Sequence, residues 1–327
     1  MPSSAQILAA LSHREFRSGE RLARQFRVTR AAVSNAVHRL LDRGLDIDRV
    51  PGRGYRLRYP IELLSIERVA RELGGTATRF AKMEVFEHLD STNGYLLGHA
   101  QDEVGAPRLC LAEHQSAGRG RRGRNWISPF GANLYLSLLY RLERASDALS
   151  ALSLVSGLAV AKALEAHGLS EFGLKWPNDI HWRERKLAGV LLEAVGETGG
   201  PVRVVIGVGI NLWMTRLRNL PPVDQPWTDL SRALDGDAIS RNRLAADVAG
   251  ELLNAVERFE AEGFAPFADA WRQRDLARDR LVTIHTRDAP LEGVARGVDP
   301  SGRLLFERAG QISAFGSGEI SLRLESR

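Results

Sequence analysis

The sequence predicts an α+β protein in three parts: a small helical module at the N-terminus, a central mixed sheet with helices, and a small β-barrel at the C-terminus. With 327 residues, the chain is long enough for two or three domains of ordinary size. Helical periodicity is concentrated in the first sixty residues, and short apolar runs typical of strands begin at about residue 83. From about residue 275, strand-like runs alternate with turns such as Asp299–Gly302.

Composition restricts the class of protein. Apolar residues make up 44% of the chain, enough for real cores, but no apolar run reaches the roughly 18–20 residues of a membrane span. The N-terminus lacks the basic start and long apolar stretch of a signal peptide. The single cysteine, Cys110, excludes internal disulfides and lies in an apolar run where a core role is expected. The eight histidines show no zinc-ligand spacing. We therefore expect a cytoplasmic protein without a structural metal.

Positive charge is concentrated in the N-terminal module. Residues 1–60 contain twelve Arg, no Lys and five acidic residues, a net charge of +7, whereas the rest of the chain carries −2. Such segregation favours nucleic acid as the partner, because neutralisation of phosphates dominates that kind of binding. Helices are predicted over about 5–12, 19–26 and 30–43. Thr29 is a suitable N-cap for the third helix, and Gly44 ends it.

The second and third predicted helices are joined by a tight turn, which is the helix-turn-helix arrangement. The Gly- and Arg-rich turn that follows at 49–57 is typical of a wing, so a winged helix-turn-helix domain is predicted over residues 1–60. The side chains expected to contact DNA are short polar or basic ones on the outer faces and in the wing: Arg21, Arg30, Ser34, Asn35, His38, Arg39 and Arg53. The alternative is a protein-interaction domain with a solvated basic face.

The segment Gly118–Trp126 packs three glycines and four arginines into nine residues. Glycine lets backbone N–H groups approach an anion closely, and arginine donates through a planar fork, so this loop predicts a negatively charged small ligand. Its Gly-x-Gly-x-x-Gly would bind a dinucleotide only if a helix began at the third glycine. Pro129 prevents that helix, and the apolar runs 109–112 and 132–140 predict strand–loop–strand. A Rossmann fold is therefore excluded. A P-loop is excluded too, because no Gly-Lys-Ser/Thr follows. The alternative to a small-ligand site is a loop that is simply solvated or that binds nucleic acid.

Further apolar runs complete the central part of the chain. Runs 186–193 and 202–212 predict neighbouring buried strands of the mixed sheet, and a long apolar helix is predicted from about 150 to 167. Lys186 and Asn211 stand at the ends of those strands, at the rim of the sheet, where ligand sites are usually found.

Six motifs occur in a fixed order, and together they resemble those of the biotin–protein ligases that also repress transcription. They are Asp-Ser-Thr-Asn (90–93), Glu-His-Gln-Ser-Ala-Gly-Arg-Gly-Arg-Arg-Gly-Arg (113–124), Ser-Pro-Phe-Gly-Ala-Asn-Leu-Tyr (128–135), Lys-Trp-Pro-Asn-Asp (175–179), Arg-Lys-Leu-Ala-Gly (185–189) and Gly-Val-Gly-Ile-Asn (207–211). With the N-terminal module and the terminal Gly-Glu-Ile-Ser-Leu-Arg (318–323), the resemblance covers nearly the whole chain. It implies a class II synthetase-like ligase core over 66–272 and an SH3-like barrel over 275–327.

The resemblance also implies the chemistry. Biotin and ATP, the latter with Mg²⁺ as the nucleotide complex, would form biotinyl-5′-adenylate, and a lysine of the biotin carboxyl carrier protein of acetyl-CoA carboxylase would then accept the biotin. Operator DNA is the second implied partner, with a homodimer forming when the adenylate is bound. Two alternatives stay open: a lipoate–protein ligase, and a transcription regulator that senses a ligand without chemistry.

The family's site residues are carried over motif by motif. Lys186, Arg119 and Arg121 are implied to be catalytic: Lys186 would hold the carboxylate and α-phosphate oxygens together, and the two arginines would close over biotin and the phosphate. The residues implied to bind biotin are Ser91, Thr92, Asn93, Gln115, Gly118, Arg119, Gly120, Arg121 and Lys186. Those implied to bind ATP or the adenylate are Trp126, Asn178, Asp179, Asn211 and Trp227, with the segment from Asn211 to about Trp227 covering the adenylate. Asn125 departs from the family pattern, which commonly has lysine there, and receives no role.

Overall fold

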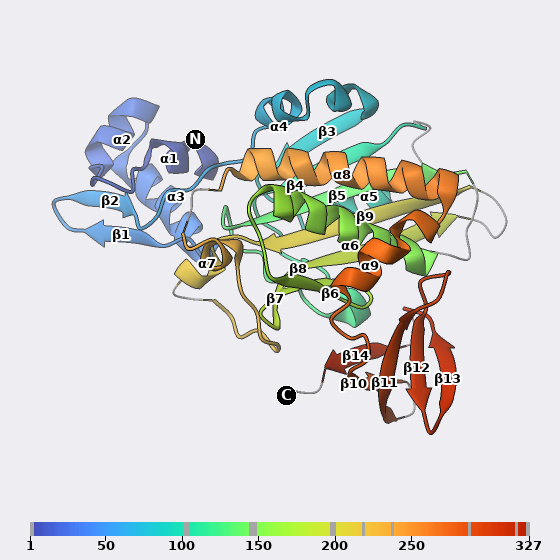
Figure 1. Cartoon of the computed structure of the whole chain (residues 1–327). Coiled ribbons are helices and arrows are strands. Elements are labelled where there is room, and N and C mark those ends of the chain that lie inside the picture. The colour runs from blue at the N-terminus through green and yellow to red at the C-terminus, as the bar shows by residue number, and fades with distance from the viewer. Residues whose placement is uncertain are drawn as a thin grey trace.

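A computed structural model of the chain describes residues 3–100, 105–143, 149–196, 201–217, 220–236, 239–286, 289–317 and 320–324. Figure 1 shows a small N-terminal body in blue, a central sheet crossed by long helices, and a separate C-terminal sheet in red. The three-part α+β prediction is confirmed.

The N-terminal body is a helix-turn-helix followed by a hairpin. It consists of α1 (Ser4–Ala10), α2 (Gly19–Phe26), α3 (Arg30–Asp42), β1 (Ile47–Val50) and β2 (Gly54–Leu57). The side chains of Ser3, Ser18 and Thr29 accept backbone N–H groups at the starts of the three helices, as good N-caps do. Val33, Val37 and other apolar side chains of the three helices form a buried core of their own. The antiparallel hairpin β1–β2 forms the predicted wing.

The central domain is built on a seven-stranded sheet in the order β3-β4-β5-β9-β8-β7-β6. Only β3 and β4 run parallel; the other neighbours are antiparallel. The strands are β3 (Lys82–Phe86), β4 (Arg108–Ala112), β5 (Asn133–Leu142), β6 (Phe172–Lys175), β7 (Asp179–Trp182), β8 (Arg185–Gly196) and β9 (Val202–Asn211). The helices are α4 (Ile66–Leu73), α5 (Thr92–Gly98), α6 (Leu149–Ala166), α7 (Leu230–Ala233), α8 (Arg241–Glu262) and α9 (Ala268–Arg274), with 3-10 turns at Gly74–Arg79, Arg121–Gly123, Met214–Arg216 and Ala265–Phe267.

The two faces of this sheet have different uses, because successive side chains of a strand point to opposite sides. On β9, Val204, Ile206 and Val208 point into the main core beneath α6 and α8. The alternate positions carry Gly207 and Gly209, which leave the opposite face open. Beside them on that face, α5 packs on Val205. Helices α6 and α8 therefore cover one face, whereas α5 covers only part of the other face and leaves the rest available for a ligand.

Helix α6 is long and apolar enough to cross a membrane by length and composition, yet 72% of it is buried inside the protein. It packs against α8 and β8 in the central core. Its apolar character is therefore explained by its place under the sheet.

The C-terminal part is a five-stranded antiparallel sheet in the order β13-β12-β11-β10-β14. The strands are β10 (Leu281–His285), β11 (Pro290–Val298), β12 (Leu304–Arg308), β13 (Gln311–Phe315) and β14 (Ser321–Leu324). It docks on the central domain where the indole N–H of Trp176 donates to the Gly302 carbonyl at 3.1 Å. Of the predicted terminal motif, residues 318 and 319 lie outside the described residues.

One loop of the central domain completes the core of the N-terminal body. The ring of Phe130, just before β5, is fully buried among the apolar side chains of the three N-terminal helices. Its backbone N–H donates to the carbonyl of Arg43, the C-cap residue of α3, at 3.1 Å. The Arg43 guanidinium lies 5.5 Å from the centre of the Phe130 ring and forms an ion pair with Glu87 at 2.9 Å. The two bodies are thus joined by shared core, and not only by the linker.

Candidate active site

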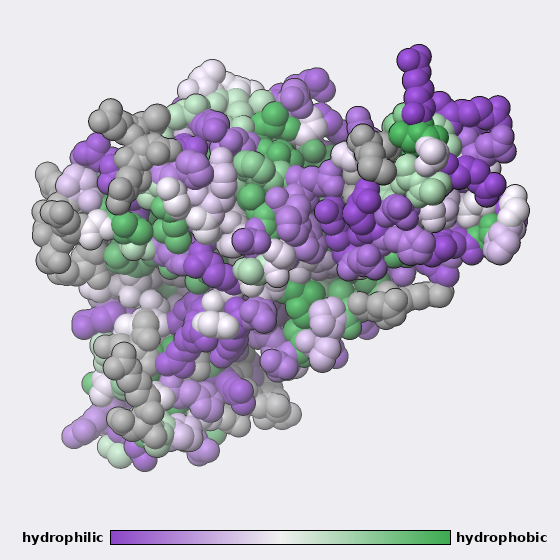
Figure 2. All heavy atoms as spheres, turned by 180° about the vertical axis from the view of Figure 1, so that it is seen from behind, coloured by the Kyte–Doolittle hydropathy of each residue, from purple (hydrophilic) through white to green (hydrophobic). Residues whose placement is uncertain are grey.

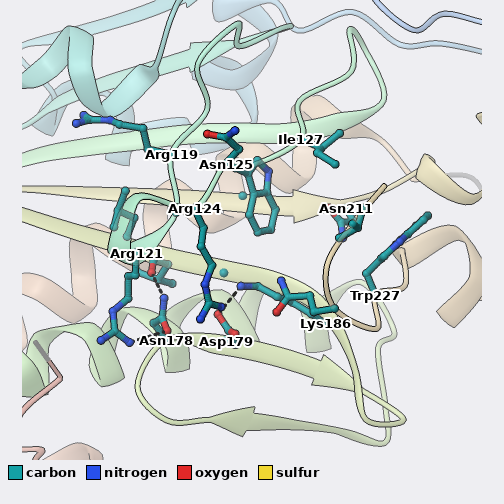
Figure 3. Close-up of a pocket in the computed structure, with 18 of the residues that line it drawn as sticks. Arg119, Arg121, Arg124, Asn125, Ile127, Asn178, Asp179, Lys186, Asn211 and Trp227 are labelled. Carbon is teal, nitrogen blue, oxygen red and sulfur yellow. Dashed lines mark hydrogen bonds and ion pairs between the residues drawn. The ribbon is translucent and has the colours of Figure 1, made fainter. Parts of the chain in front are cut away.

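A pocket of about 1210 Å³ opens on the face of the central sheet opposite α6 and α8. Figure 3 shows it between the loop that carries Arg119 and Arg121, the strands that carry Asp179 and Lys186, and the segment that carries Trp227. Thirteen of the fourteen residues predicted to bind biotin or the nucleotide line it: Ser91, Thr92, Asn93, Gln115, Arg119, Gly120, Arg121, Trp126, Asn178, Asp179, Lys186, Asn211 and Trp227. Gly118 does not line the pocket. It lies behind the loop, where a Cβ would come 2.5 Å from the Trp126 carbonyl oxygen.

The arginine-rich segment folds as a small hairpin between β4 and β5, so the predicted strand–loop–strand context is confirmed. The Gly120 N–H donates to the Arg124 carbonyl at 2.7 Å, and the Trp126 N–H donates to the Gly118 carbonyl at 2.8 Å. The turn at its tip uses left-handed backbone at Arg122 and Gly123, with φ of 58° and 71°. This tip is a single 3-10 turn and not the start of an α-helix, which is why the glycine fingerprint does not make a Rossmann site.

Two glycines of β9 make room for side chains that line the pocket. A Cβ at Gly209 would lie 2.5 Å from the Trp126 ring, and a Cβ at Gly207 would lie 2.1 Å from the Asn93 side-chain oxygen. Both distances are below any real van der Waals contact. Glycine at these positions lets the indole and the amide lie flat on the sheet, and so sets the depth of the floor.

Lys186 and Asp179 form the charged centre of the pocket. The Lys186 Nζ lies 2.8 Å from the Asp179 Oδ1, and both side chains are mostly buried. Burial alone would raise the pKa of the Asp179 carboxyl, but the Lys186 ammonium and the neighbouring His181 hold it well below its usual range. The Lys186 Nζ also lies 5.4 Å from the centre of the Trp126 ring. The result is a largely buried ion pair at the rim of the sheet.

A second group of cations lies where the C-terminal sheet meets the pocket. The Arg121 guanidinium donates to the Asn178 Oδ1 at 3.3 Å and to the Ser317 carbonyl. Asn178 is itself fixed, because its side-chain N–H donates to the Val190 carbonyl at 2.6 Å. Burial lowers the pKa of Arg121 and that of Lys175, whose ammonium is partly compensated by Asp179. Several partly desolvated cations facing one cavity are suited to a polyphosphate.

The opposite end of the pocket is a network of hydrogen bonds among uncharged side chains, with the Glu193 carboxylate at its edge. Gln115 accepts the Thr92 backbone N–H at 2.8 Å, and the Ser137 hydroxyl lies 2.7 Å from the Thr92 hydroxyl and 2.6 Å from the Asn93 Oδ1. The Asn93 side-chain N–H donates to Glu193 at 2.8 Å. These buried amide and hydroxyl groups would recognise an uncharged polar ring system.

Asn211 and Trp227 stand together on one side of the cavity (Figure 3). The Asn211 side-chain N–H donates to the Thr228 carbonyl at 3.0 Å. The segment 226–228 is tied to β8, with the Lys186 N–H donating to the Pro226 carbonyl and the Thr228 N–H donating to the Lys186 carbonyl. The covering segment is thereby linked directly to the backbone of the candidate catalytic lysine. Residues 218 and 219 of this segment lie outside the described residues.

Among the charged residues that were not predicted as site residues, Lys175 and Arg124 line the pocket, and Glu193 lies beside it. Lys175 belongs to a motif that was recognised, so its charge was an available signal. Arg124 projects from the loop toward Asp179 in Figure 3. Glu193 forms an ion pair with Arg119 at 3.1 Å, but nothing in its apolar strand sequence marks it as part of a site.

Among the residues that the structure describes, no group of three or more His, Cys, Asp or Glu side chains could hold a metal ion. The Asp179 carboxylate is already paired with Lys186. The donor set of the described residues therefore does not fit a resident metal.

The predicted DNA-binding residues share the outer surface of α2, α3 and the wing. Arg21, Arg30, Asn35, His38, Arg39 and Arg53 are exposed, and Ser34 is half-buried. Figure 2, seen from behind, shows hydrophilic residues over much of this body on the right of the view. The His38 Nε2 accepts a hydrogen bond from Arg49 of the wing at 2.7 Å, which ties the wing to the recognition helix.

The fold and the pocket define a ligase core that carries a DNA-binding module. Residues 85–211 match the Biotin/lipoate A/B protein ligase family, residues 4–56 match an HTH domain, and residues 279–323 match the Biotin protein ligase C terminal domain.

The chain is 43% identical to the Bifunctional ligase/repressor BirA of Escherichia coli (strain K12), over 97% of this chain and 96% of that protein. It is 33% identical to the Biotin–[acetyl-CoA-carboxylase] ligase of Mycobacterium tuberculosis, over 81% of this chain and 97% of that protein. The structure of the biotin protein ligase from Aquifex aeolicus in complex with biotin and ATP is similar, with a TM-score of 0.62, 28% identity, and coverage of 75% of this chain and 100% of that one. The chain therefore belongs to the biotin protein ligase family, in the form that carries an N-terminal helix-turn-helix.

Proposed function

We propose that this chain is an ATP-dependent biotin–protein ligase that also binds DNA as a transcriptional repressor, with biotinyl-5′-adenylate as corepressor. The observation that carries the ligase function is the pocket itself. It places a neutral hydrogen-bonding end, around Gln115 and Asn93, beside a cationic end around Lys186 and Arg121. An uncharged ureido ring fits the hydrogen-bonding end, with its carboxylate tail directed toward the cations. A nucleoside triphosphate fits the cationic end.

The cations of the pocket offset the repulsion between the two anions that react in the first step. A biotin carboxylate oxygen attacks the α-phosphate of ATP, the bond to the β-phosphate oxygen breaks, and pyrophosphate leaves. The two anions repel each other by roughly 4 kcal/mol at 4 Å in an effective dielectric of about 20. Lys186 would lie between them, Arg119 and Arg121 would close over them, and Asp179 would keep the Lys186 side chain in place. Positive charge fixed before the reaction stabilises the transition state without reorganisation.

In the second step, a lysine amine of the acceptor attacks the acyl carbon of the adenylate, and AMP leaves. We propose the biotin carboxyl carrier protein of acetyl-CoA carboxylase as the acceptor, supported by the name of the Mycobacterium tuberculosis relative. The loop that carries residues 119–127 lines the pocket, and its tip at 122–125 is exposed, so we expect the acceptor lysine to approach the acyl carbon from this side. A cytoplasmic location fits these substrates.

Pyrophosphate exchange with biotin and with lipoate in separate reactions tests the ligase. We expect exchange with biotin only, and exchange with lipoate only would contradict the proposal. Lys186→Ala should lower the exchange rate roughly 10²- to 10³-fold, the usual cost of a lost transition-state donor. Lys162→Ala is the matched control, because Lys162 is exposed on α6 and its partner Glu251 lies on α8. An unchanged rate in Lys186→Ala would contradict the catalytic role of Lys186, and no exchange with either acid in the unsubstituted protein would show that the core senses its ligand without this chemistry.

The repressor function rests on the helix-turn-helix and its exposed arginines. One small recognition helix usually needs a two-fold partner to reach useful affinity, so we propose a homodimer in the adenylate-bound state. Sedimentation and operator retardation with and without biotin plus ATP test this proposal. Dimerisation and tighter DNA binding are expected together, and the absence of any ligand effect on both would contradict the switch.

A further inference from the structure

His181 lines the pocket from β7 but has no part in the mechanism above. Its side chain is only 8% exposed, and neither ring nitrogen has a hydrogen-bond partner. Buried polar groups are nearly always paired, so each exception needs an explanation. An unpaired imidazole beside a reaction centre indicates a partner that it meets in another state of the site.

The sheet determines which partner is within reach. Strand alternation places Asp179 and His181 on the pocket face of β7, while Ile180 and Trp182 point into the core. A β-bulge follows Ile180 and brings His181 opposite Lys186 of β8. On its other side, the neighbouring residue of β6 is Gly173, which has no side chain to pair with the ring.

The distances form a chain of three groups. The His181 Nε2 is 3.9 Å from the Asp179 Oδ2, and the Asp179 Oδ1 is 2.8 Å from the Lys186 Nζ. The distance between His181 and Asp179 is longer than a hydrogen bond, which spans about 2.7–3.2 Å. A small rotation of either side chain would close the difference. The carboxylate thus has one oxygen on the lysine and the other facing the histidine.

We propose that His181 is a positioning residue for adenylate formation: its Nε2–H donates to the Asp179 carboxylate when the substrates bind, and so fixes the direction in which Asp179 holds the Lys186 ammonium. This inference rests on the proposed function and adds a residue to it. A carboxylate held by one cation alone can rotate. A second donor on its free oxygen restricts that rotation, as outer groups do for ligands that touch the reacting atoms. Lys175 of β6 and the loop arginines Arg121 and Arg124 (Figure 3) also face Asp179, but none of them forms a hydrogen bond with its free oxygen among the contacts of the described residues.

Three substitutions in the full-length protein separate positioning from packing. His181→Phe keeps the ring and removes both nitrogens. His181→Gln places an amide N–H near the Nε2 position, whereas His181→Asn places it near Nδ1, which does not face Asp179. The readouts are kcat and KM for biotin and ATP in pyrophosphate exchange, together with the Tm of each variant.

We expect His181→Phe to lower kcat roughly 10- to 100-fold, the scale of a small misplacement of a catalytic group, with the KM for biotin nearly unchanged. His181→Gln should recover most of the loss, and His181→Asn should not. Equal kcat in His181→Phe and the unsubstituted protein, or equal rates for the Gln and Asn variants, would overturn the proposal. If His181→Phe does not fold, the Gln and Asn comparison decides. Failure of the unsubstituted protein to exchange with biotin would instead contradict the proposed function.

Discussion

At the residue scale, the shape of the pocket depends on two positions of β9 that have no side chain. Because Gly207 and Gly209 have no side chains, Asn93 and Trp126 can lie against the sheet. The two glycines serve opposite ends of the pocket, so they allow the two ends to be tested separately.

We predict that Gly207→Ala raises the KM for biotin and Gly209→Ala raises the KM for ATP. Overpacking costs about 1–3 kcal/mol, which corresponds to roughly 5- to 150-fold in affinity. Steady-state exchange kinetics measures both constants. Gly75→Ala is the control, because a Cβ there meets nothing within 4 Å. The same change of both constants in both variants would show that the sheet had moved as a whole.

A second prediction concerns His114, whose Nδ1 lies 2.9 Å from the Nδ1 of His88. Burial, then His88 and Arg43, lower the pKa of His114 to about 4. The unfolded chain, with the ordinary pKa near 6.5, therefore binds more protons than the folded protein between about pH 6.5 and 4. Stability from this group is complete above pH 6.5 and is lost as the pH falls toward 4.

The measurement is the Tm between pH 7.5 and 5. His114→Gln should flatten part of the decline, whereas His13→Gln, at an exposed position of the N-terminal body, should leave it unchanged. Identical pH profiles for the His114→Gln and unsubstituted proteins would contradict the assignment.

The sequence predicted the place of some residues in the site and not that of others. Lys186 and Arg121 carry charge within recognisable motifs, and both line the pocket. His181 and Glu193 belong to the same surface only because strand alternation and a bulge turn them toward it. Their partners lie on other strands, so register and not local sequence brings them into the site. Gly118 was expected in the pocket, but it is in contact with the Trp126 backbone behind it.

At the scale of elements, the segment between the hairpin and β5 connects two bodies over a few residues. Ser128 donates to the Trp126 carbonyl at 3.0 Å and accepts from Gln115 at 3.2 Å, while Phe130 is buried in the N-terminal core. The alternation of helices and strands was predictable from periodicity. The insertion of Phe130 was not, because a Ser-Pro-Phe-Gly turn reads locally as a loop.

We predict that Phe130→Ala destabilises the N-terminal body by about 3–5 kcal/mol, the usual cost of emptying a Phe site in a core. DNA binding should be lost at a lower temperature than ligand binding, and the KM for biotin should rise because Ser128 loses its anchor. Calorimetry and operator retardation measure these effects. Val50→Ala, at an exposed wing position, is the control. A single unchanged thermal transition would contradict the shared core.

At the scale of the whole molecule, three parts meet around one pocket. The central sheet supplies the floor, and the C-terminal sheet supplies Arg323 and the Ser317 carbonyl that holds Arg121. The N-terminal body is joined to the loop side through Phe130. The charge of each part was visible in the sequence, with +7 in the first sixty residues. Their assembly was predictable only through resemblance, since composition carries no information on docking.

We propose above that the pocket activates biotin and that the biotinyl group is then transferred to a lysine of a carrier protein. The most direct test is the mass of a biotin carboxyl carrier domain after incubation with this protein, biotin, ATP and Mg²⁺. We predict an increase of one biotinyl group on a single lysine, formed far more slowly with Lys186→Ala and absent when lipoate replaces biotin. An unmodified carrier domain, or one that carries a lipoyl group instead, would contradict it.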